Sequence, residues 1–457
     1  MYKNKNLLFI LTLSAALVSC SWLSAPKTPN IDLPLQFSLQ NNDFQSMESL
    51  PYLAWWQQFN DSKLNYLIES GLKSNLDVSI ALSNLDSARG QLSKIQLSWI
   101  PFVNLYTGYT TNPAFGNAGT FYGIWPQYTI NIMQMLKQQE LAKYNLEMSN
   151  AMVDGVRLTV IGQISTAYFT LIAEQEQFNL LLVLSNDISK LVKIYNDKIS
   201  VGLDQDINIA DILVEQKMID AQINIVQNNI QLSQNSLRYL INQNPGNIDT
   251  TNDFAKIDFS LFKPGNLPAT VLQNRPDIKI AEYQVKASHT SVAIAYSSLF
   301  PSLQLDSFFG AGSGNGTLAA PSNYFPIQDD YINWGINPST FGQIEAQKGA
   351  YQAQVYSYIQ TVRKALRDTD NSMSSNKQYS MNYVNTLKAK VAFDKKYNLR
   401  NELYQTGIIG LQEILSDRIQ LDKLAIRVNE TKLQQAIILV NLYQELAGGY
   451  KYVAESH

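Results

Sequence analysis

Two long stretches of this chain contain no proline: the first lies between Pro126 and Pro245, and the second follows Pro338. A proline inside a helix costs about 3 kcal/mol, so its absence leaves room for unusually long helices. Apolar residues recur in both stretches at three- and four-residue spacing, as in Ile207, Ala210, Leu213, Val214 and Met218, and in Leu411, Ile414, Leu415, Ile419 and Leu421. This spacing is typical of helices, so we expect both stretches to be largely helical.

Each stretch carries a glycine near its middle, Gly202 in the first and Gly407 in the second. Glycine readily adopts the left-handed conformation that ends many helices. We therefore expect two helical hairpins that turn at residues 200–208 and 405–413. Arms on the order of 40–60 residues would extend roughly 60–90 Å at 1.5 Å per residue. A compact globule has little use for such arms, whereas a long barrel or stalk is built from them.

The two halves of the chain match each other. Residues 75–81 (NLDVSIA) match residues 275–281 (RPDIKIA), and residues 99–101 (WIP) match residues 299–301 (LFP) at the same offset. The tip glycines pair at a slightly larger offset, and a tandem duplication explains all three matches.

Pro276 and Asp277 favour a helix start in the second copy, because proline suits the first turn and a carboxylate there meets the positive end of the helix dipole. We predict one structural repeat at residues 60–265 and another at residues 266–457. Each repeat should hold a helix, two strands (near 101–134 or 301–338) and a helical hairpin.

Two segments are depleted of charge. No charged residue lies between Lys94 and Lys137, and no Lys or Arg lies between Lys286 and Lys348. Both segments are rich in aromatic residues and contain short runs with strand-like alternation, at residues 102–109, 128–133, 303–309 and 331–336. Membrane β-barrels combine an apolar outer band with aromatic girdles, so these runs indicate a barrel wall. A soluble β-hairpin with aromatic cross-strand pairs is the alternative.

Four strands are too few for a membrane barrel, since known bacterial barrels begin at about eight. An open sheet edge cannot face lipid because its backbone groups would stay unpaired. Three copies of the chain would supply twelve strands, so this interpretation requires a homotrimer. The expected fold class is mainly α with a β-barrel part: long helical hairpins, four strands per chain and a twelve-stranded barrel.

The N-terminus resembles a secretory signal, with Lys3 and Lys5 before a short apolar stretch that ends at Cys20. Residues 17–20 (LVSC) resemble the lipobox of bacterial lipoproteins, in which the cysteine is acylated after cleavage. We predict a signal peptide at residues 1–19 and a lipid-anchored tether at residues 20–59. Ser21 follows the cysteine, which by this resemblance directs the protein to the outer membrane; a chance cysteine in a signal cleaved elsewhere is the alternative.

The composition argues against several functions. The net charge is −3 and offers no basic surface for nucleic acid. The chain has two histidines, His289 and His457, so neither a histidine metal site nor a Ser-His triad is expected. Carboxylates are plentiful but show no arrangement with a base or metal partner, so we expect neither an enzyme nor a cofactor.

Several motifs resemble one family in order and spacing. They are Trp55-Trp56-Gln57-Gln58-Phe59 with Asp61 and Leu64, Ala167 to Leu171 (AYFTL), Leu267-Pro268 with Arg275 to Ile278 (RPDI), and Leu442 to Gly449 (LYQELAGG). This pattern resembles the TolC-like outer membrane factors, in their lipoprotein branch that serves tripartite efflux pumps. After the second strand the chain departs from the family, because residues 131–136 (NIMQML) replace an Asp and a Phe-Gly turn; residues 338–342 (PSTFG) keep more of that pattern.

The resemblance implies a passive exit duct for drugs or other small molecules that extends from the outer membrane into the periplasm. A periplasmic adaptor would open it and an inner-membrane transporter would energise export. The adaptor would contact the tips, at residues 200–206 and 405–411. The aperture candidates, six and nine positions after each tip glycine, are Asn208, Asp211, Glu413 and Ser416, with Asp417 one position further. A ring of carboxylates there would favour cations, although solvated helix residues would show the same pattern. An outer-membrane-tethered helical scaffold without a pore is the alternative function.

Overall fold

The computed structural model describes residues 29, 31, 47–111, 119–203, 206–250, 254–259, 269–313, 323–328 and 330–452. Cys20, the predicted signal and most of the predicted tether lie outside these residues. The chain forms two compact units. The first is built mainly from Leu82–Met152 and Asp277–Thr361, and the second mainly from Val153–Pro276 and Val362–His457 together with Asp32–Ala81. Each unit therefore draws on both halves of the chain.

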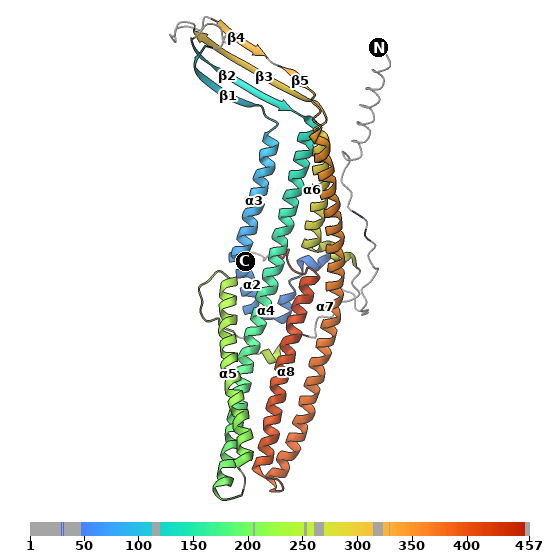
Figure 1. The fold of residues 1–457 in the computed structure, drawn as a ribbon. Helices are drawn as coiled ribbons and strands as arrows, with labels where there is room; N and C mark the ends of the chain where they lie inside the picture. Colours follow the sequence, from blue (N-terminus) through green and yellow to red (C-terminus); the bar gives the residue numbers. More distant parts are fainter. Residues whose placement is uncertain are drawn as a thin grey trace. The chain divides into compact units, whose positions relative to one another are not determined.

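Both halves follow the same order of elements, as the internal repeat predicts (Figure 1). The first half consists of the short 3₁₀ helices η1 (Met47–Tyr52) and η2 (Trp55–Phe59), then α2 (Ser62–Ser74), α3 (Leu76–Leu97), β1 (Phe102–Thr110), β2 (Gly119–Ile130), α4 (Ile132–Ser200) and α5 (Asp206–Leu240). The second half consists of η4 (Phe254–Lys256), η5 (Ala269–Asn274), α6 (Pro276–Ser297), β3 (Ser302–Ser313), β4 (Asn323–Gln328), β5 (Tyr331–Asn333), α7 (Ser339–Gln405) and α8 (Leu411–Glu445).

The helical hairpins have unequal arms. The descending helices α4 and α7 contain 69 and 67 residues, whereas the returning helices α5 and α8 contain 35 each. In both halves the first helix of the hairpin is longer than the 40–60 residues expected and the second is shorter. The first helix is longer because it starts directly after a strand. The symmetry of the two hairpins is nevertheless retained.

Five strands form one antiparallel sheet in the order β1-β2-β3-β4, with β5 also paired to β3 (Figure 1). Ser307 of β3 lies opposite Gln328 of β4, and Ser302 of β3 lies opposite Asn333 of β5. Moving five residues along β3 thus moves five residues along the opposite segment, so β4 and β5 continue one register. The sheet therefore has four strand positions, as expected, with the fourth strand interrupted near Asp330.

The register places different chemistry on the two faces of the sheet. Cross-strand pairs put one set of residues on a largely apolar face: Val103, Leu105, Tyr109, Tyr122, Ile124, Tyr128, Ile130, Leu303, Leu305, Phe309 and Ile332. The opposite face is more mixed. It carries polar and small residues (Asn104, Gly108, Gly123, Gln127, Thr129, Gln304 and Asp306) together with aromatic ones (Phe102, Tyr106, Phe121 and Trp125). On the apolar face Leu105 is 82% exposed and Ile332 is 72% exposed, so the described residues leave this face uncovered.

Asparagines mark the change from strand to long helix in both halves. The Asn131 side chain accepts a hydrogen bond from the Gln134 amide at 3.0 Å, and Asn337 accepts one from the Ser339 amide at 3.0 Å. A side-chain oxygen at this position satisfies an otherwise unpaired amide of the first helical turn. The expected strand at residues 128–133 was therefore placed too far along the chain, because β2 runs from Gly119 to Ile130. The expected strand at residues 331–336 was too long, because β5 ends at Asn333. The Asn131 cap occupies the site where the sequence departs from the family pattern.

The aromatic motif near the start of the described chain builds the core of the second unit. Trp55 stacks on Tyr443 of α8, with 4.4 Å between the ring centroids and 8° between the planes. Asp61 caps α2 by accepting from the Lys63 and Leu64 amides, and its second oxygen accepts from the Tyr168 hydroxyl at 2.6 Å. Burial and this contact raise the pKa of Tyr168. These motif residues therefore have structural roles.

Gly449 packs against this core, and a substitution there tests the packing. Its φ is +88°, and a Cβ atom there would lie 2.5 Å from Cζ3 of Trp56. We expect Gly449→Ala to lower the free energy of unfolding, because left-handed backbone alone costs an alanine roughly 1–2 kcal/mol and the indole must also move. Thermal unfolding of the detergent-purified protein measures the effect.

Gly448→Ala is the matched control. A Cβ at Gly448 would meet Trp55 at 3.4 Å, an ordinary contact distance, and the backbone there is not left-handed. Equal melting temperatures for the two variants would contradict the packing described here.

Candidate functional site: the helical tips and the α4–α8 interface

The two hairpins turn with the same backbone geometry. Gly202 has φ +74° and Gly407 has φ +76°. Each glycine amide donates to the carbonyl three residues earlier, and the next amide donates five residues back, from Leu203 to Lys198 at 2.8 Å and from Ile408 to Leu403 at 2.9 Å. This is the Schellman arrangement that ends helices on a left-handed residue. Helices α4 and α7 therefore each end on a left-handed glycine, Gly202 and Gly407.

The turns present apolar side chains to solvent. Val201 is 66% exposed, Leu203 is 75% exposed and Ile408 is 70% exposed. No described residue covers them, and each lies within a turn bounded by helix ends. The tips are thus suited to packing against the apolar surface of another helix.

The aperture candidates follow these turns at the start of α5 and α8. Asp211 is exposed and makes no polar contact with the described residues. Glu413 is exposed and forms an ion pair with Arg400 of α7 at 2.8 Å, and the Ser416 hydroxyl donates to the Gln412 carbonyl at 2.8 Å. Asn208 lies in α5, but its side chain is outside the described set. Asp211 and Glu413 are therefore the two carboxylates among these candidates that remain accessible.

Asp417 differs from the other candidates because its carboxylate is buried. It is 9% exposed and forms ion pairs with Lys396, at 2.8 Å, and with Arg400. Both partners belong to α7. Asp417 therefore fastens α8 to α7 within the second hairpin.

The first hairpin meets the second where α4 packs against α8. Buried residues alternate at three- and four-residue spacing on both helices: Leu181, Leu184, Ile188 and Leu191 on α4, and Leu415, Ile419 and Ile426 on α8. This is the spacing of a coiled-coil interface. Contacts join Gln412 to Tyr195 and Asn429 to Gln177, so the two helices run antiparallel.

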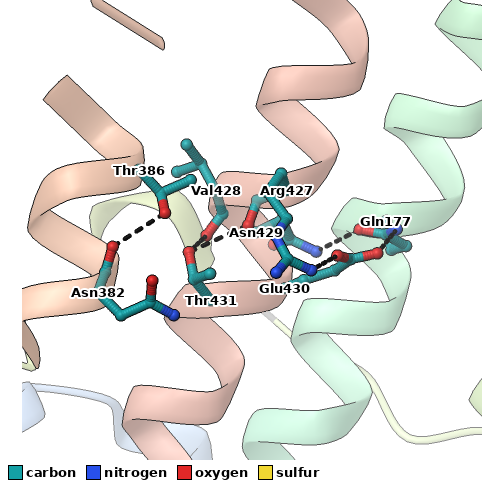
Figure 2. A network of polar contacts seen from close by, with 8 residues as sticks. All are labelled: Gln177, Asn382, Thr386, Arg427, Val428, Asn429, Glu430 and Thr431. Atoms are coloured by element: carbon teal, nitrogen blue, oxygen red, sulfur yellow. Dashed lines mark hydrogen bonds and ion pairs between the residues drawn. The ribbon is translucent and has the colours of Figure 1, made fainter. Parts of the chain in front are cut away.

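Polar residues interrupt this interface at the same spacing. Near the tip, Gln412 donates to the Tyr195 hydroxyl at 2.6 Å and accepts from Lys198. Further along, Asn429 donates at 2.9 Å to the Gln177 side chain (Figure 2). It also donates at 2.9 Å to the Ala173 carbonyl. A buried polar residue at a coiled-coil position fixes register at some cost in stability. These two polar layers therefore fix the register of α8 against α4.

A third polar layer lies between the other two. Asp422 of α8 is buried and faces Asp187 of α4, with Arg418 Nε 3.5 Å from Asp422 and 3.6 Å from Asp187. Burial raises the pKa of Asp422 to about 6; Arg418 opposes this shift and Asp187 adds to it. We call Asp187, Arg418 and Asp422 the acidic layer.

The tips are predicted from the sequence, whereas the polar layers are not. Their signal is present, because Leu415, Ile419, Asp422, Ile426 and Asn429 follow one alternating spacing. The apolar spacing predicts only a helix, and the packing shows that Asp422 and Asn429 within it are buried.

No family model matches the chain. The chain is 22% identical to SilC of Salmonella typhimurium, a probable outer membrane lipoprotein, over 460 residues that cover 92% of this chain and 94% of SilC. It is 24% identical to the toluene efflux pump outer membrane protein TtgC of Pseudomonas putida over 480 residues, covering 98% and 96%. The open state of the MtrE outer membrane channel of Neisseria gonorrhoeae matches with a TM-score of 0.80 at 20% identity, covering 95% of this chain and all of that one.

These similarities run along nearly the whole chain and agree with the duplicated order of elements, the four-position sheet and the paired hairpins. The chain is thus similar, over nearly its whole length and in fold, to TolC-like outer membrane factors.

Proposed function

We propose that this chain is the outer-membrane channel of a tripartite efflux system and acts as a passive exit duct. The observation that carries this proposal is the sheet, which has one apolar exposed face, one more polar face and two open edges. A membrane barrel needs these two faces, one toward lipid and one toward the lumen. Such a duct does no chemistry of its own.

The open edges require further copies of the chain. Within the described residues, β1 pairs on one side only, and the strand formed by β4 and β5 pairs only with β3. Unpaired backbone groups cost several kcal/mol each in hydrocarbon, so both edges must find partners. Three copies joined edge to edge close twelve strand positions, enough to leave a lumen.

A second feature, in the other unit, supports the same assembly. Met218, Ile225, Leu232 and Tyr239 of α5 recur at seven-residue spacing and are 57–68% exposed. A different face of α5 packs into the buried cluster through Val226. Among the described residues, the exposed α5 stripe therefore has no partner. A heptad stripe of this kind fits a helix of a second copy.

The proposed partners follow from the tips and the family. A periplasmic adaptor would pack its own helices against the apolar turns around Gly202 and Gly407. An inner-membrane transporter would supply the energy, and acylation of Cys20 would anchor each copy to outer-membrane lipid. Drugs or other small molecules are the proposed cargo, as for the efflux protein TtgC.

The tethered helical scaffold is the competing function. A scaffold has no use for an exposed apolar face on a sheet that also lacks charged residues over residues 102–130. The sheet therefore favours the channel.

Charges on the α5 stripe should break the assembly. Burying an isoleucine or leucine side chain is worth roughly 1.5–3 kcal/mol, and a carboxylate in its place would resist burial. We expect Ile225→Glu with Leu232→Glu to convert a detergent-extracted trimer into monomers, measured as mass by light scattering.

Gln227→Glu on an exposed position of the same helix is the control and should remain trimeric. A wild-type protein that is monomeric in the outer-membrane fraction would instead favour the tethered scaffold.

Cysteines at the two accessible carboxylates test the aperture. We expect the Asp211→Cys, Glu413→Cys double variant to lose export after treatment with a bifunctional thiol reagent, because covalent links across the aperture would prevent it from widening. Accumulation of a fluorescent efflux substrate in treated cells measures the loss. Each single variant, treated alike, is the control, and undiminished export despite crosslinking confirmed by electrophoresis would exclude a lining role for this pair.

A further inference from the structure

The acidic layer occupies a position that an ionised carboxylate does not favour. Asp422 follows Leu415 and Ile419 and precedes Ile426 in the buried stripe of α8. Burying a charge is costly unless it is paired and hydrogen-bonded. Here Asp422 faces a second carboxylic acid, Asp187, instead of a closely paired cation, and both side chains are 9% exposed.

The counter-charges do not satisfy both acids. Lys190 of α4 forms an ion pair with Asp187 at 2.7 Å, and its charge also acts against the raised pKa of Asp422 without forming an ion pair with it. Arg418 is shared at 3.5 and 3.6 Å, beyond ordinary hydrogen-bond length, and its guanidinium also lies over the Tyr397 ring of α7. Oxygen Oδ2 of Asp422 is buried and receives no hydrogen bond from the described residues. A proton shared by the two carboxyl groups would supply the missing donor.

The remaining charges nearby are already paired. On α8, Lys423 forms an ion pair with Glu215 of α5, and on α7, Lys396 pairs with Asp417. Among the residues that the structure describes, no charged group of α5 or α7 forms an ion pair with Asp422, so the layer responds to its own protonation. A cavity of about 510 Å³ bounded by Asp187, Lys190, Tyr397 and Arg418 lies beside the layer and gives protons access.

We propose that the acidic layer is a proton-sensitive latch between the two hairpins: protonation tightens the α4–α8 interface, and deprotonation loosens it. The inference rests on the proposed function, because separation of the hairpins regulates the duct only if the tips form its aperture. It concerns regulation by proton concentration, apart from any adaptor.

The direction follows from linkage. Packing raises the pKa of Asp422 from 3.8 to about 6, so the closed interface binds the proton more tightly than a separated one in which the acid is solvated. The closed state is therefore favoured most at low pH and loses that advantage as pH rises through this interval. Between about pH 5 and about pH 7.5 the equilibrium constant for opening should rise roughly tenfold.

Hydrogen exchange tests the latch in the full-length trimer. Protection factors of α8 amides between residues 411 and 426 should be roughly tenfold higher near pH 5 than near pH 7.5, after correction for intrinsic exchange. In Asp422→Asn the protection should be high and equal at both pH values, because the amide is neutral throughout. Asp187→Asn is a second variant in case the first does not fold, and it should lessen the pH dependence.

Asp220→Asn is the matched control, since Asp220 is a solvent-accessible acid of α5 paired with Lys217. It should retain the wild-type pH dependence. Equal protection of the wild-type interface at both pH values would overturn the latch, as would an unchanged pH dependence in Asp422→Asn.

Planar-bilayer recordings of the same preparations separate the two proposals. We expect the open probability of the wild type to rise with pH and that of Asp422→Asn to remain low. Absence of any conductance, together with pH-dependent protection, would refute the duct and leave the latch standing on the exchange data.

Discussion

Pairing of backbone groups at the sheet edges is the constraint on which the assembly depends. The four strand positions of one chain leave β1 and the interrupted β4–β5 strand unpaired on one side each. Water would satisfy these groups, but the exposed apolar face that includes Leu105 and Ile332 directs the sheet to lipid, where no water is available. The same chain leaves an apolar heptad stripe exposed on α5. The unpaired sheet edges and the exposed α5 stripe lie in separate units, and association with further copies would cover both.

How far the sequence predicts this architecture depends on whether a feature is local. The absence of proline and the positions of Gly202 and Gly407 predict the hairpins, because helix continuity and helix ends are decided within a few residues. Strand ends were predicted less well. Alternation at residues 128–133 suggested a strand, but the Asn131 side chain caps α4, so β2 ends at Ile130, three residues before the expected end. The segment that forms β4 was not expected to be a strand, because its pairing with β3 is a long-range contact that periodicity does not reveal.

The candidate site shows the same limit. Counting from the tip glycines identifies Asp211, Glu413 and Asp417, but only packing separates the exposed acids from Asp417, whose carboxylate is held by Lys396 and Arg400. Apolar spacing in the sequence identified helix α8 but could not say which helix covers it. That its stripe is buried against α4 while the corresponding stripe on α5 remains exposed follows from tertiary structure.

The α4–α8 interface combines two kinds of interaction with opposite effects. Leucine and isoleucine layers stabilise contact without fixing its register, because similar layers can exchange places by sliding. The layers at Gln412, Asp422 and Asn429 each favour one register, and each is less stabilising than an apolar side chain would be. A duct that must open benefits from this combination, since an entirely apolar interface would resist separation and an entirely polar one would not hold the hairpins together. Among the three polar layers, those at Gln412 and Asn429 are centred on side-chain amides, which do not titrate. Only the layer at Asp422 couples the strength of the interface to proton concentration.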